Sequence, residues 1–338
     1  MTLIKTPTLF RQAVGTALAA AVAALLAAPL AADEGELPRG HFTLPERGNV
    51  IGENYSVVVE EGDTLVDIAR RHNIGYEAIR MANPEVSLWA PFAGTEVTVP
   101  NRHILPDAPR EGIVVNLSEL RLYYYSAEGV VETYPISVGR EGFGTPVGVT
   151  RTTVKVKDPH WSPPRSMREE AAARGEPPPT VVPPGPENPL GRHAILLALP
   201  SYLIHGTNKP EGVGMRVSRG CIRMYPEDIE SLYARVPSGT QVNIIDQPFK
   251  AAWSEDGVLY AQSFPQLEEN QGSVEPIVNA IEVVSQAFGE EQPPVDYAQL
   301  RHAVENPDGM LVSLLQSAEE GPAPEPVNLY DELMLSTR

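Results

Sequence analysis

The sequence has one cysteine, Cys221, among 338 residues, so an intramolecular disulfide is excluded. In an exported protein a single cysteine is either a free reactive thiol or half of an intermolecular bridge. Basic residues are also few: 26 Lys and Arg stand against 44 Asp and Glu, for a formal charge of −18. Such a charge argues against nucleic acids and anionic membrane surfaces as partners, because both attract basic proteins.

Long apolar runs are scarce as well, and the only one spans Ala13 to Leu30. Lys5 and Arg11 precede it and acidic residues follow it, which predicts a secretory signal peptide at residues 1–32. A membrane anchor is the alternative, since the run is near spanning length. Its alanine-rich composition and the lack of a following basic cluster favour removal. No cysteine lies near the cleavage point, which excludes a lipid anchor there. We therefore predict a periplasmic protein without a membrane span after processing.

The residues that are present around Cys221 indicate chemistry. Cys221 lies in the segment Ser218 to Arg223, and the segment His205-Gly206-Thr207 precedes it in the chain. A histidine near a cysteine can share its proton and so produce a thiolate nucleophile. We predict Cys221 as the nucleophile and His205 as its acid–base partner, with an inert buried thiol as the alternative. The scattered histidines lack the close-paired spacing of a zinc site, so neither a metal nor another cofactor is expected.

The neighbours of this pair are predicted to support it. Gly220 allows a tight turn at the cysteine, so that adjacent N–H groups could form an oxyanion hole. Arg223 could lower the pKa of the thiol or bind a substrate carboxylate in a bidentate pair. A surface salt bridge between Arg223 and Asp228 is the alternative reading of that arginine.

The region at residues 54–101 is predicted to be a small α/β domain. Its predicted elements are a strand at 55–59, helices at 64–71 and 76–83, and a strand at 95–99, with Asp63 or Thr64 as the first helix cap. The motifs Gly-Asp-Thr-Leu at 62–65, Ile68-Ala69 and Asn83-Pro84 make this region resemble a LysM module. Since LysM modules bind glycans that contain N-acetylglucosamine, the resemblance implies docking on peptidoglycan. A spacer domain without glycan affinity is the alternative.

Residues 111–247 are predicted to form a second, mainly β domain. Strands are predicted at 113–117, 121–125, 130–138, 149–157, 193–199, 201–207 and 241–245, and a helix from Pro226 to Gly239. Residues 158–192 are a Pro-rich insertion with Trp161 and a short helical pattern at 168–174. We interpret this insertion as a lid, because it immediately precedes the strand that carries His205; disorder is the alternative.

The motifs of this second domain resemble a known family. The L,D-transpeptidase (YkuD) signature is His-Gly followed by Ser-X-Gly-Cys-(Ile/Val)-Arg, and here it begins at His205 and at Ser218. The insertion, with Trp161 and the segment 182–195, resembles the ErfK/YbiS/YcfS/YnhG subgroup, whose members also carry a signal peptide and an amino-terminal LysM module. The sequence has Arg219 where some members have His or Ser, a difference that bears on the local pKa.

The resemblance implies a fold and an activity. The fold would be an L,D-transpeptidase-like β-sandwich with a short helix after the cysteine loop. Cys221 would attack the carbonyl of the third stem-peptide residue, expel the terminal D-alanine and form a thioester. The acceptor would be an amine, from an outer-membrane lipoprotein lysine or a second diaminopimelate, or else water. Supporting roles would fall to the Gly206 carbonyl, which orients the histidine, to Ser218, which shapes the turn, and to Thr207, which contacts substrate.

Two further points stay open from the sequence. Apolar residues recur at helical spacing between Val274 and Phe288 and again at Leu311, Leu314 and Leu315, so residues 250–338 are predicted to form a helical extension. A cysteine peptidase or amidase that uses water, and a glycan-binding scaffold without activity, are the alternative functions. The intact set of His205, Cys221 and Arg223 favours an enzyme over the scaffold.

Overall fold

The computed structural model describes residues 37–127, 129–176, 180–272, 275–288 and 293–315. The predicted signal peptide at 1–32 and the end of the predicted extension lie outside these residues. Every helix within the described ranges is too short or too polar to span a bilayer.

The region that resembles LysM has the predicted strand–helix–helix–strand order. Its elements are β3 (Tyr55–Val58), α2 (Leu65–Arg71), α3 (Tyr76–Ala82) and β4 (Glu96–Val99), and β3 pairs with β4 antiparallel. Thr64 is the cap of α2: its hydroxyl accepts from the Asp67 N–H at 3.1 Å, and the Asp67 carboxylate accepts from the Thr64 N–H at 3.1 Å. This reciprocal pair satisfies N–H groups that the helix itself leaves free, which fixes where α2 begins.

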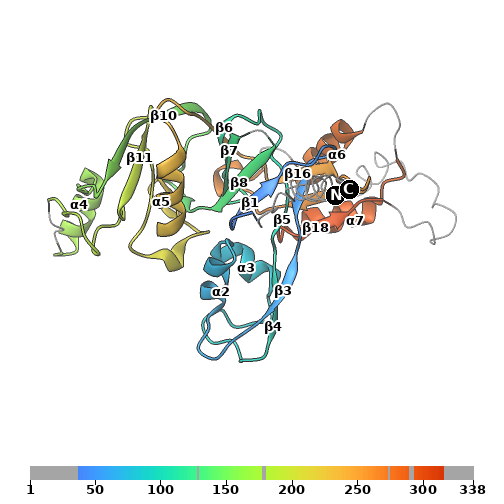
Figure 1. Cartoon of the computed structure of the whole chain (residues 1–338), viewed down its shortest axis with the longest axis horizontal. Helices are drawn as coiled ribbons and strands as arrows, with labels where there is room; N and C mark the ends of the chain where they lie inside the picture. Colours follow the sequence, from blue (N-terminus) through green and yellow to red (C-terminus); the bar gives the residue numbers. More distant parts are fainter. Residues whose placement is uncertain (1–36, 128, 177–179, 273–274, 289–292, 316–338) are drawn as a thin grey trace, which may run out of the picture. The chain divides into compact units, whose positions relative to one another are not determined.

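The second domain is built on one curled sheet of nine strands (Figure 1). The strand order is β1-β8-β7-β6-β15-β10-β11-β12-β14. The bounds are β1 (His41–Thr43), β6 (Gly112–Asn116), β7 (Arg121–Ala127), β8 (Val130–Pro135), β10 (Gly148–Lys157), β11 (His193–Leu197), β12 (Leu203–His205), β14 (Ile222–Arg223) and β15 (Gln241–Ile245). The mainly β fold is confirmed.

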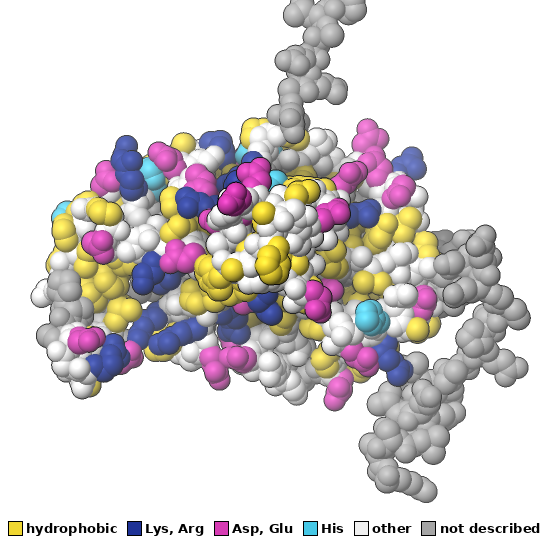
Figure 2. Space-filling model, turned by 90° about the horizontal axis from the view of Figure 1, so that it is seen from below, with side chains coloured by type: hydrophobic (Ala, Val, Ile, Leu, Met, Phe, Trp, Pro, Cys, Tyr) yellow, Lys and Arg dark blue, Asp and Glu magenta, His cyan; other side chains and the backbone are white. Residues whose placement is uncertain are grey.

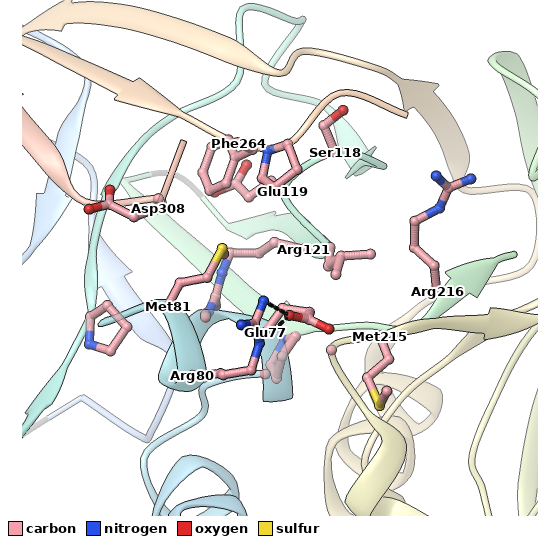
Figure 3. A pocket seen from close by; sticks show the side chains of 18 of the residues that line it. Glu77, Arg80, Met81, Ser118, Glu119, Arg121, Met215, Arg216, Phe264 and Asp308 are labelled. Carbon is pink, nitrogen blue, oxygen red and sulfur yellow. Dashed lines mark hydrogen bonds and ion pairs between the residues drawn. The ribbon is translucent and has the colours of Figure 1, made fainter. Parts of the chain in front are cut away.

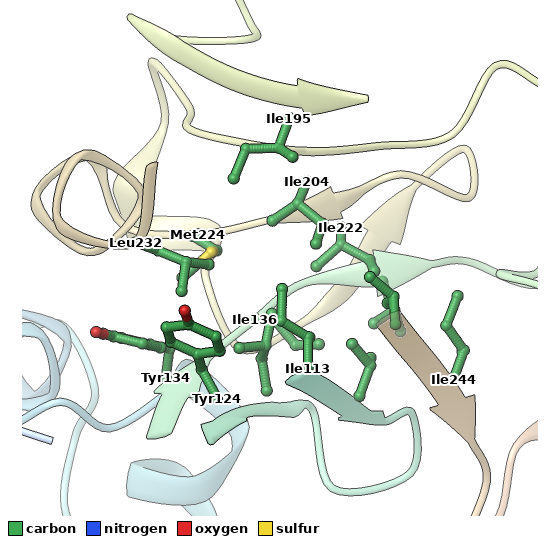
Figure 4. Close-up of a cluster of buried hydrophobic side chains, with 14 of the residues drawn as sticks. Ile113, Tyr124, Tyr134, Ile136, Ile195, Ile204, Ile222, Met224, Leu232 and Ile244 are labelled. Carbon is green, nitrogen blue, oxygen red and sulfur yellow. The ribbon is translucent and has the colours of Figure 1, made fainter. Parts of the chain in front are cut away.

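Side chains from both halves of the curled sheet meet in one core. Ile113 and Tyr124 from β6 and β7 lie in the same buried cluster as Ile204 and Ile222 from β12 and β14 (Figure 4). Helix α5 (Pro226–Arg235) contributes Leu232 to this cluster. Burying these apolar faces holds β12 and β14 side by side, which matters because they carry the candidate catalytic residues.

Several short elements differ from the prediction. Strands β1, β2 (Val50–Gly52) and β5 (Arg102–Ile104) lie in segments for which the sequence predicts no strand. Strand β9 (Val138–Gly139) is separate from β8 and pairs with β13 (Arg216–Ser218). Helix α5 ends at Arg235 rather than Gly239, because Pro237 disfavours helical geometry in the residue before it.

The extension contains the helix predicted between Val274 and Phe288, a further helix and an additional sheet. Helices α6 (Pro276–Ala287) and α7 (Tyr297–Glu305) accompany a three-stranded sheet of β16 (Phe249–Trp253), β17 (Leu259–Ser263) and β18 (Leu311–Ser313). The helical reading of Leu311 to Leu315 was wrong: residues 311–313 pair antiparallel with β17. Three apolar residues in so short a segment fit either structure, and the neighbouring strand decides between them.

A buried ion pair joins the extension to the second domain. Lys250 on β16 donates to Glu119 at 2.8 Å, and the side chains expose only 3% and 2% of their surface. Burial lowers the pKa of Lys250, and Glu119 opposes this shift. Tyr123 also donates to Glu119. Lys250 is therefore the cation in direct contact with this carboxylate, in a site closed to water.

Replacing this lysine with an apolar residue is expected to be costly. Lys250→Met should reduce the free energy of unfolding by about 3–5 kcal/mol, because it leaves a buried carboxylate without its cation. Urea unfolding of the full chain measures this loss. The double variant Lys250→Met/Glu119→Gln should recover much of it, and equal stability of Lys250→Met and the parent would contradict the assignment.

Candidate active site

Strands β12 and β14 bring the predicted residues to one face of the sheet. They pair parallel, with Ile204 opposite Ile222 and His205 opposite Arg223. Both isoleucines point into the core, with 0% and 1% exposure. Since side chains alternate along a strand, His205 and Arg223 project from the other face. Cys221 lies immediately before β14, two positions before Arg223. The register thus places His205 of β12 and Arg223 of β14 side by side.

The thiol of Cys221 is partly accessible and protonated at rest. Its Sγ donates to the carbonyl oxygen of Ser201 at 3.5 Å. Burial raises the pKa of Cys221, while a backbone hydrogen bond from Leu203 and the charge of Arg223 lower it by less. The thiol is thus not fully buried. Ser201 itself has φ +71, an uncommon conformation for a residue with a side chain.

His205 is buried, oriented and neutral. Its Nδ1 lies 2.6 Å from the carbonyl oxygen of Gly206, so Nδ1 carries the proton and Nε2 is left as the acceptor. Burial, and then the charge of Arg223, lower the pKa of His205 to about 4, against smaller opposing effects of the Gly206 and Leu190 backbones. At neutral pH this imidazole can accept a proton.

The turn before the cysteine depends on Ser218 and Gly220. The Ser218 hydroxyl donates to the Cys221 carbonyl at 2.6 Å and accepts from the Gly220 N–H at 3.1 Å. Gly220 has φ +101, and a Cβ there would lie 2.7 Å from a ring carbon of Tyr202. Only glycine fits this position. The Gly220 N–H is occupied by Ser218, so this group is not a free donor for an oxyanion.

The loop at residues 139–148 supplies site residues that sequence reasoning missed. Thr145 donates from Oγ1 to the Gly220 carbonyl at 2.8 Å and accepts from the Gly139 N–H at 3.1 Å. The ring of Phe143 lies beneath the guanidinium of Arg219, 4.4 Å from its centroid. The glycines of this segment indicated only a loop, and nothing local to it pointed to a site more than 70 positions further along the chain.

The two arginines of the signature have different surroundings. Arg219 forms an ion pair with Glu170 on the insertion, so its charge is directed there. The alternative pairing of Arg223 with Asp228 is wrong, because Asp228 binds Arg39. Within the described part of the chain, the buried Nε of Arg223 has no hydrogen-bond partner. An unpaired buried donor costs free energy unless something binds it.

Thr207 follows the histidine strand and is buried at 5% exposure. Its hydroxyl accepts from the Lys209 N–H at 3.0 Å. Thr207 thus begins the loop that leads from β12 towards the cysteine.

The insertion at 158–192 is folded where it is described. It contains α4 (Arg165–Ala173) and a bridge between Trp161 and Val182. The fully buried Asn188 donates to the Pro159 carbonyl at 2.8 Å and accepts from the Leu190 N–H at 2.9 Å. One amide side chain therefore fastens the two ends of the insertion together.

Metal-binding geometry is absent from the described ranges, where no three His, Cys, Asp or Glu side chains gather as ligands. His193 packs its ring against Tyr233, with centroids 4.8 Å apart, as an ordinary structural residue.

The chain is similar to known proteins in both of its domains. The model of the L,D-transpeptidase catalytic domain (YkuD) matches residues 110–244, and that of the LysM domain matches residues 57–100. The probable L,D-transpeptidase YcfS of Escherichia coli K12 is 43% identical over 255 residues, which cover 74% of this chain and 78% of the relative. The probable L,D-transpeptidase YbiS of the same strain is 39% identical over 280 residues, which cover 81% and 91%. The crystal structure of L,D-transpeptidase 3 from Mycobacterium tuberculosis is 19% identical with a TM-score of 0.32, covering 60% of this chain and 97% of that one.

The chain therefore belongs to the L,D-transpeptidase family, and it is an enzyme that joins a YkuD catalytic domain to a LysM domain.

Proposed function

We propose that this enzyme transfers acyl groups between peptidoglycan stem peptides and an amine through a thioester on Cys221. The observation that carries this proposal is the register of β12 and β14, which sets His205 beside Arg223, two positions after the one cysteine of the sequence. The donor would be a tetrapeptide stem, and the group expelled would be its terminal D-alanine.

The resting charges suggest the order of proton transfers. Both Cys221 and His205 are neutral at pH 7, since burial raises the pKa of the thiol and lowers that of the imidazole. Nε2 of His205 would take the thiol proton as sulfur attacks the donor carbonyl. When the C–N bond breaks, the same proton goes to the departing D-alanine amine. An acceptor amine then attacks the thioester and gives up a proton to His205. The C–S bond breaks, and the departing sulfur takes that proton from His205.

The orientation of His205 is the task of the Gly206 carbonyl. Holding Nδ1 at 2.6 Å fixes both the tautomer and the ring plane. Nε2 would then be the atom that takes the thiol proton. Ser218 and Gly220 would set the turn that presents Cys221, while Arg219 would fix that turn to the insertion through Glu170.

Arg223 is suited to the substrate as well as to the thiol. Its guanidinium lowers the pKa of Cys221, and its buried Nε lacks a partner among the described residues. A stem-peptide carboxylate would satisfy that donor and gain a charge-assisted bond. Thr207, at the end of the histidine strand, would contact the same peptide.

The other domains would bring this site to its substrate. The LysM domain, residues 54–101, would bind the glycan, and its exposed Trp89 and Phe92 show 58% and 86% of their surface, suited to stacking on sugars. Figure 2 shows hydrophobic side chains mixed with both signs of charge on the face viewed. The insertion at 158–192 would act as a lid on the catalytic domain at 111–247, with residues 250–338 as a separate extension.

The location and the acceptor complete the proposal. The signal peptide at 1–32 would export the protein to the periplasm, where stem peptides are found. The acceptor would be an outer-membrane lipoprotein lysine or a diaminopimelate side chain.

Mass spectrometry of muropeptides tests this function. Cells that produce the parent enzyme should contain amine-linked products that disappear with Cys221→Ala. Shortened tripeptides alone would show that water is the acceptor and the enzyme a hydrolase. Profiles that are the same for both proteins would leave only a glycan-binding scaffold.

The pH dependence should respond to Arg223. His205 must be neutral to accept a proton, and its pKa is lowered to about 4, so kcat/KM should fall only as the pH approaches 4. Arg223→Gln removes one cause of this lowering and should move the acid limb towards the ordinary histidine value of about 6.5. Burial persists as the larger cause, so the move is partial. Arg223→Lys keeps the charge and should keep the limb. An acid limb unmoved by Arg223→Gln would contradict the assignment.

A further inference from the structure

The LysM helix α3 begins against the loop that connects His205 to Cys221. The Tyr76 N–H donates to the Val213 carbonyl at 2.9 Å, and the Glu77 N–H donates to the Gly214 carbonyl at 3.2 Å. First-turn N–H groups of a helix need partners from outside the helix. The N-cap of α3 is Gly75, which has no side chain to supply them. Carbonyls of the catalytic loop therefore cap the LysM helix.

The two backbones approach each other through a pair of glycines. A Cβ on Gly75 would lie 2.8 Å from the Cα of Gly214, closer than real Cβ atoms come to other atoms. The φ of Gly75 is −86, a value that any residue adopts. Glycine is therefore required here because a Cβ would collide with Gly214, and not because of the backbone conformation. Contact at this seam, defined as Gly75 to Glu77 against Val213 and Gly214, leaves no room for a side chain.

A second set of contacts lies just beyond the cysteine in sequence. The Tyr225 hydroxyl donates to the Ile74 carbonyl at 3.0 Å, and Tyr225 is fully buried. Arg70 forms a bidentate pair with Glu227, with both N–O distances at 2.9 Å. The LysM module thus contacts the chain on either side of Cys221, at 213–214 and at 225–227.

A cavity lies next to the seam, and Gly75, Glu77 and Gly214 are among the residues that line it. The cavity has a volume of about 410 Å³ and is lined by Glu77 and Met81 of α3, by Met215 and Arg216 of the loop, and by Phe264 (Figure 3). The hydrogen bonds to α3 hold the loop beside this cavity, and the pairing of β13 with β9 holds it on the catalytic-domain side. From Arg216 the chain runs through β13 directly to the turn that carries the nucleophile.

We propose that the LysM module positions the Cys221 loop, with Gly75 as the positioning residue at the seam. LysM would then do more than bind glycan: it would complete the alignment of sulfur and imidazole, at a fixed place relative to the glycan. This inference rests on the proposed function only in taking Cys221 as the nucleophile.

A matched pair of glycine substitutions tests it in the full chain. Gly75→Ala places a methyl group against Gly214, whereas Gly212→Ala, in the same loop, meets open space. D-alanine release from a soluble tetrapeptide should fall about tenfold or more in Gly75→Ala, since a displacement of about 1 Å near reacting groups can cost about a hundredfold. Gly212→Ala should match the parent.

A second readout separates positioning from loss of folding. The chain has one cysteine, so the pH dependence of its alkylation by iodoacetamide reports the pKa of Cys221 alone. That pKa should shift in Gly75→Ala and stay unchanged in Gly212→Ala, while binding to insoluble peptidoglycan is retained by both.

The outcomes distinguish this inference from the proposed function. A parent enzyme that releases no D-alanine defeats the function but leaves the alkylation test intact. Equal alkylation profiles and equal rates for Gly75→Ala and the parent overturn the positioning role. Should Gly75→Ala fail to fold, Tyr225→Phe is the second test, because it removes the hydroxyl that donates to the Ile74 carbonyl. Its alkylation profile should shift from that of the parent, and no shift there also overturns the proposal.

Discussion

Cys221→Ala should abolish the release of D-alanine from a tetrapeptide donor, with a loss of at least about a thousandfold in kcat. The reason is chemical: no other cysteine exists in the chain, and an alanine cannot form a thioester. Loss of a covalent nucleophile in other acyl-transfer enzymes costs up to about a millionfold. Initial rates measured with purified protein, against a no-enzyme background, give the number.

A binding assay provides the control for this variant. Cys221 lies in the catalytic domain, so Cys221→Ala should bind insoluble peptidoglycan like the parent if LysM supplies the glycan affinity. A variant that keeps more than about a tenth of the parent rate would contradict thioester chemistry, because such residual rates exceed what binding and oxyanion stabilisation supply after nucleophile loss.

His205→Gln should give the next largest effect, a loss of about a hundredfold to ten-thousandfold in kcat/KM near pH 7. Burial raises the pKa of Cys221, so without the imidazole base little thiolate forms at neutral pH. The rate of the variant should therefore increase as the pH rises through the raised pKa of the thiol. The parent should already be active near pH 7, because His205 takes the thiol proton there. Rates between pH 6 and pH 10 measure this difference.

His193→Gln is the matched control for the second variant. His193 is also buried, and burial also lowers its pKa, but its ring packs on Tyr233. It should keep nearly the parent rate and pH profile. Equal losses in the two histidine variants would mean that His205 acts through stability instead of proton transfer.

The parts of the fold that the sequence predicts are those with local signals. Thr64 and Asp67 form a reciprocal cap that can be read from four adjacent positions, and α2 begins where expected. Strand β15 at 241–245 matches its alternating pattern. Strands β1, β2 and β5 have three residues each, too few for a period to show, and they exist because distant strands pair with them.

The candidate site divides in the same way. Two short segments contain the residues whose types predict the chemistry: His205, Gly206, Ser218, Gly220 and Cys221. The residues that hydrogen-bond to them cannot be predicted in this way, because they lie far away in the sequence. Thr145, for example, donates to the Gly220 carbonyl from 75 positions away. The pairing of Arg219 with Glu170 also spans 49 positions, and no local pattern chooses that carboxylate over its neighbours. Contacts over such distances in the sequence depend on the folded sheet, so no local pattern predicts them.

The intact mass of the enzyme, quenched in acid during turnover of a tetrapeptide donor, tests the thioester most directly. The mass of the parent should increase by that of the tripeptide acyl group, and digestion should locate the adduct on the peptide that contains Cys221. An added amine acceptor should remove the adduct. Cys221→Ala should gain nothing. Release of D-alanine without any adduct, or an adduct carried by another residue, would contradict the account.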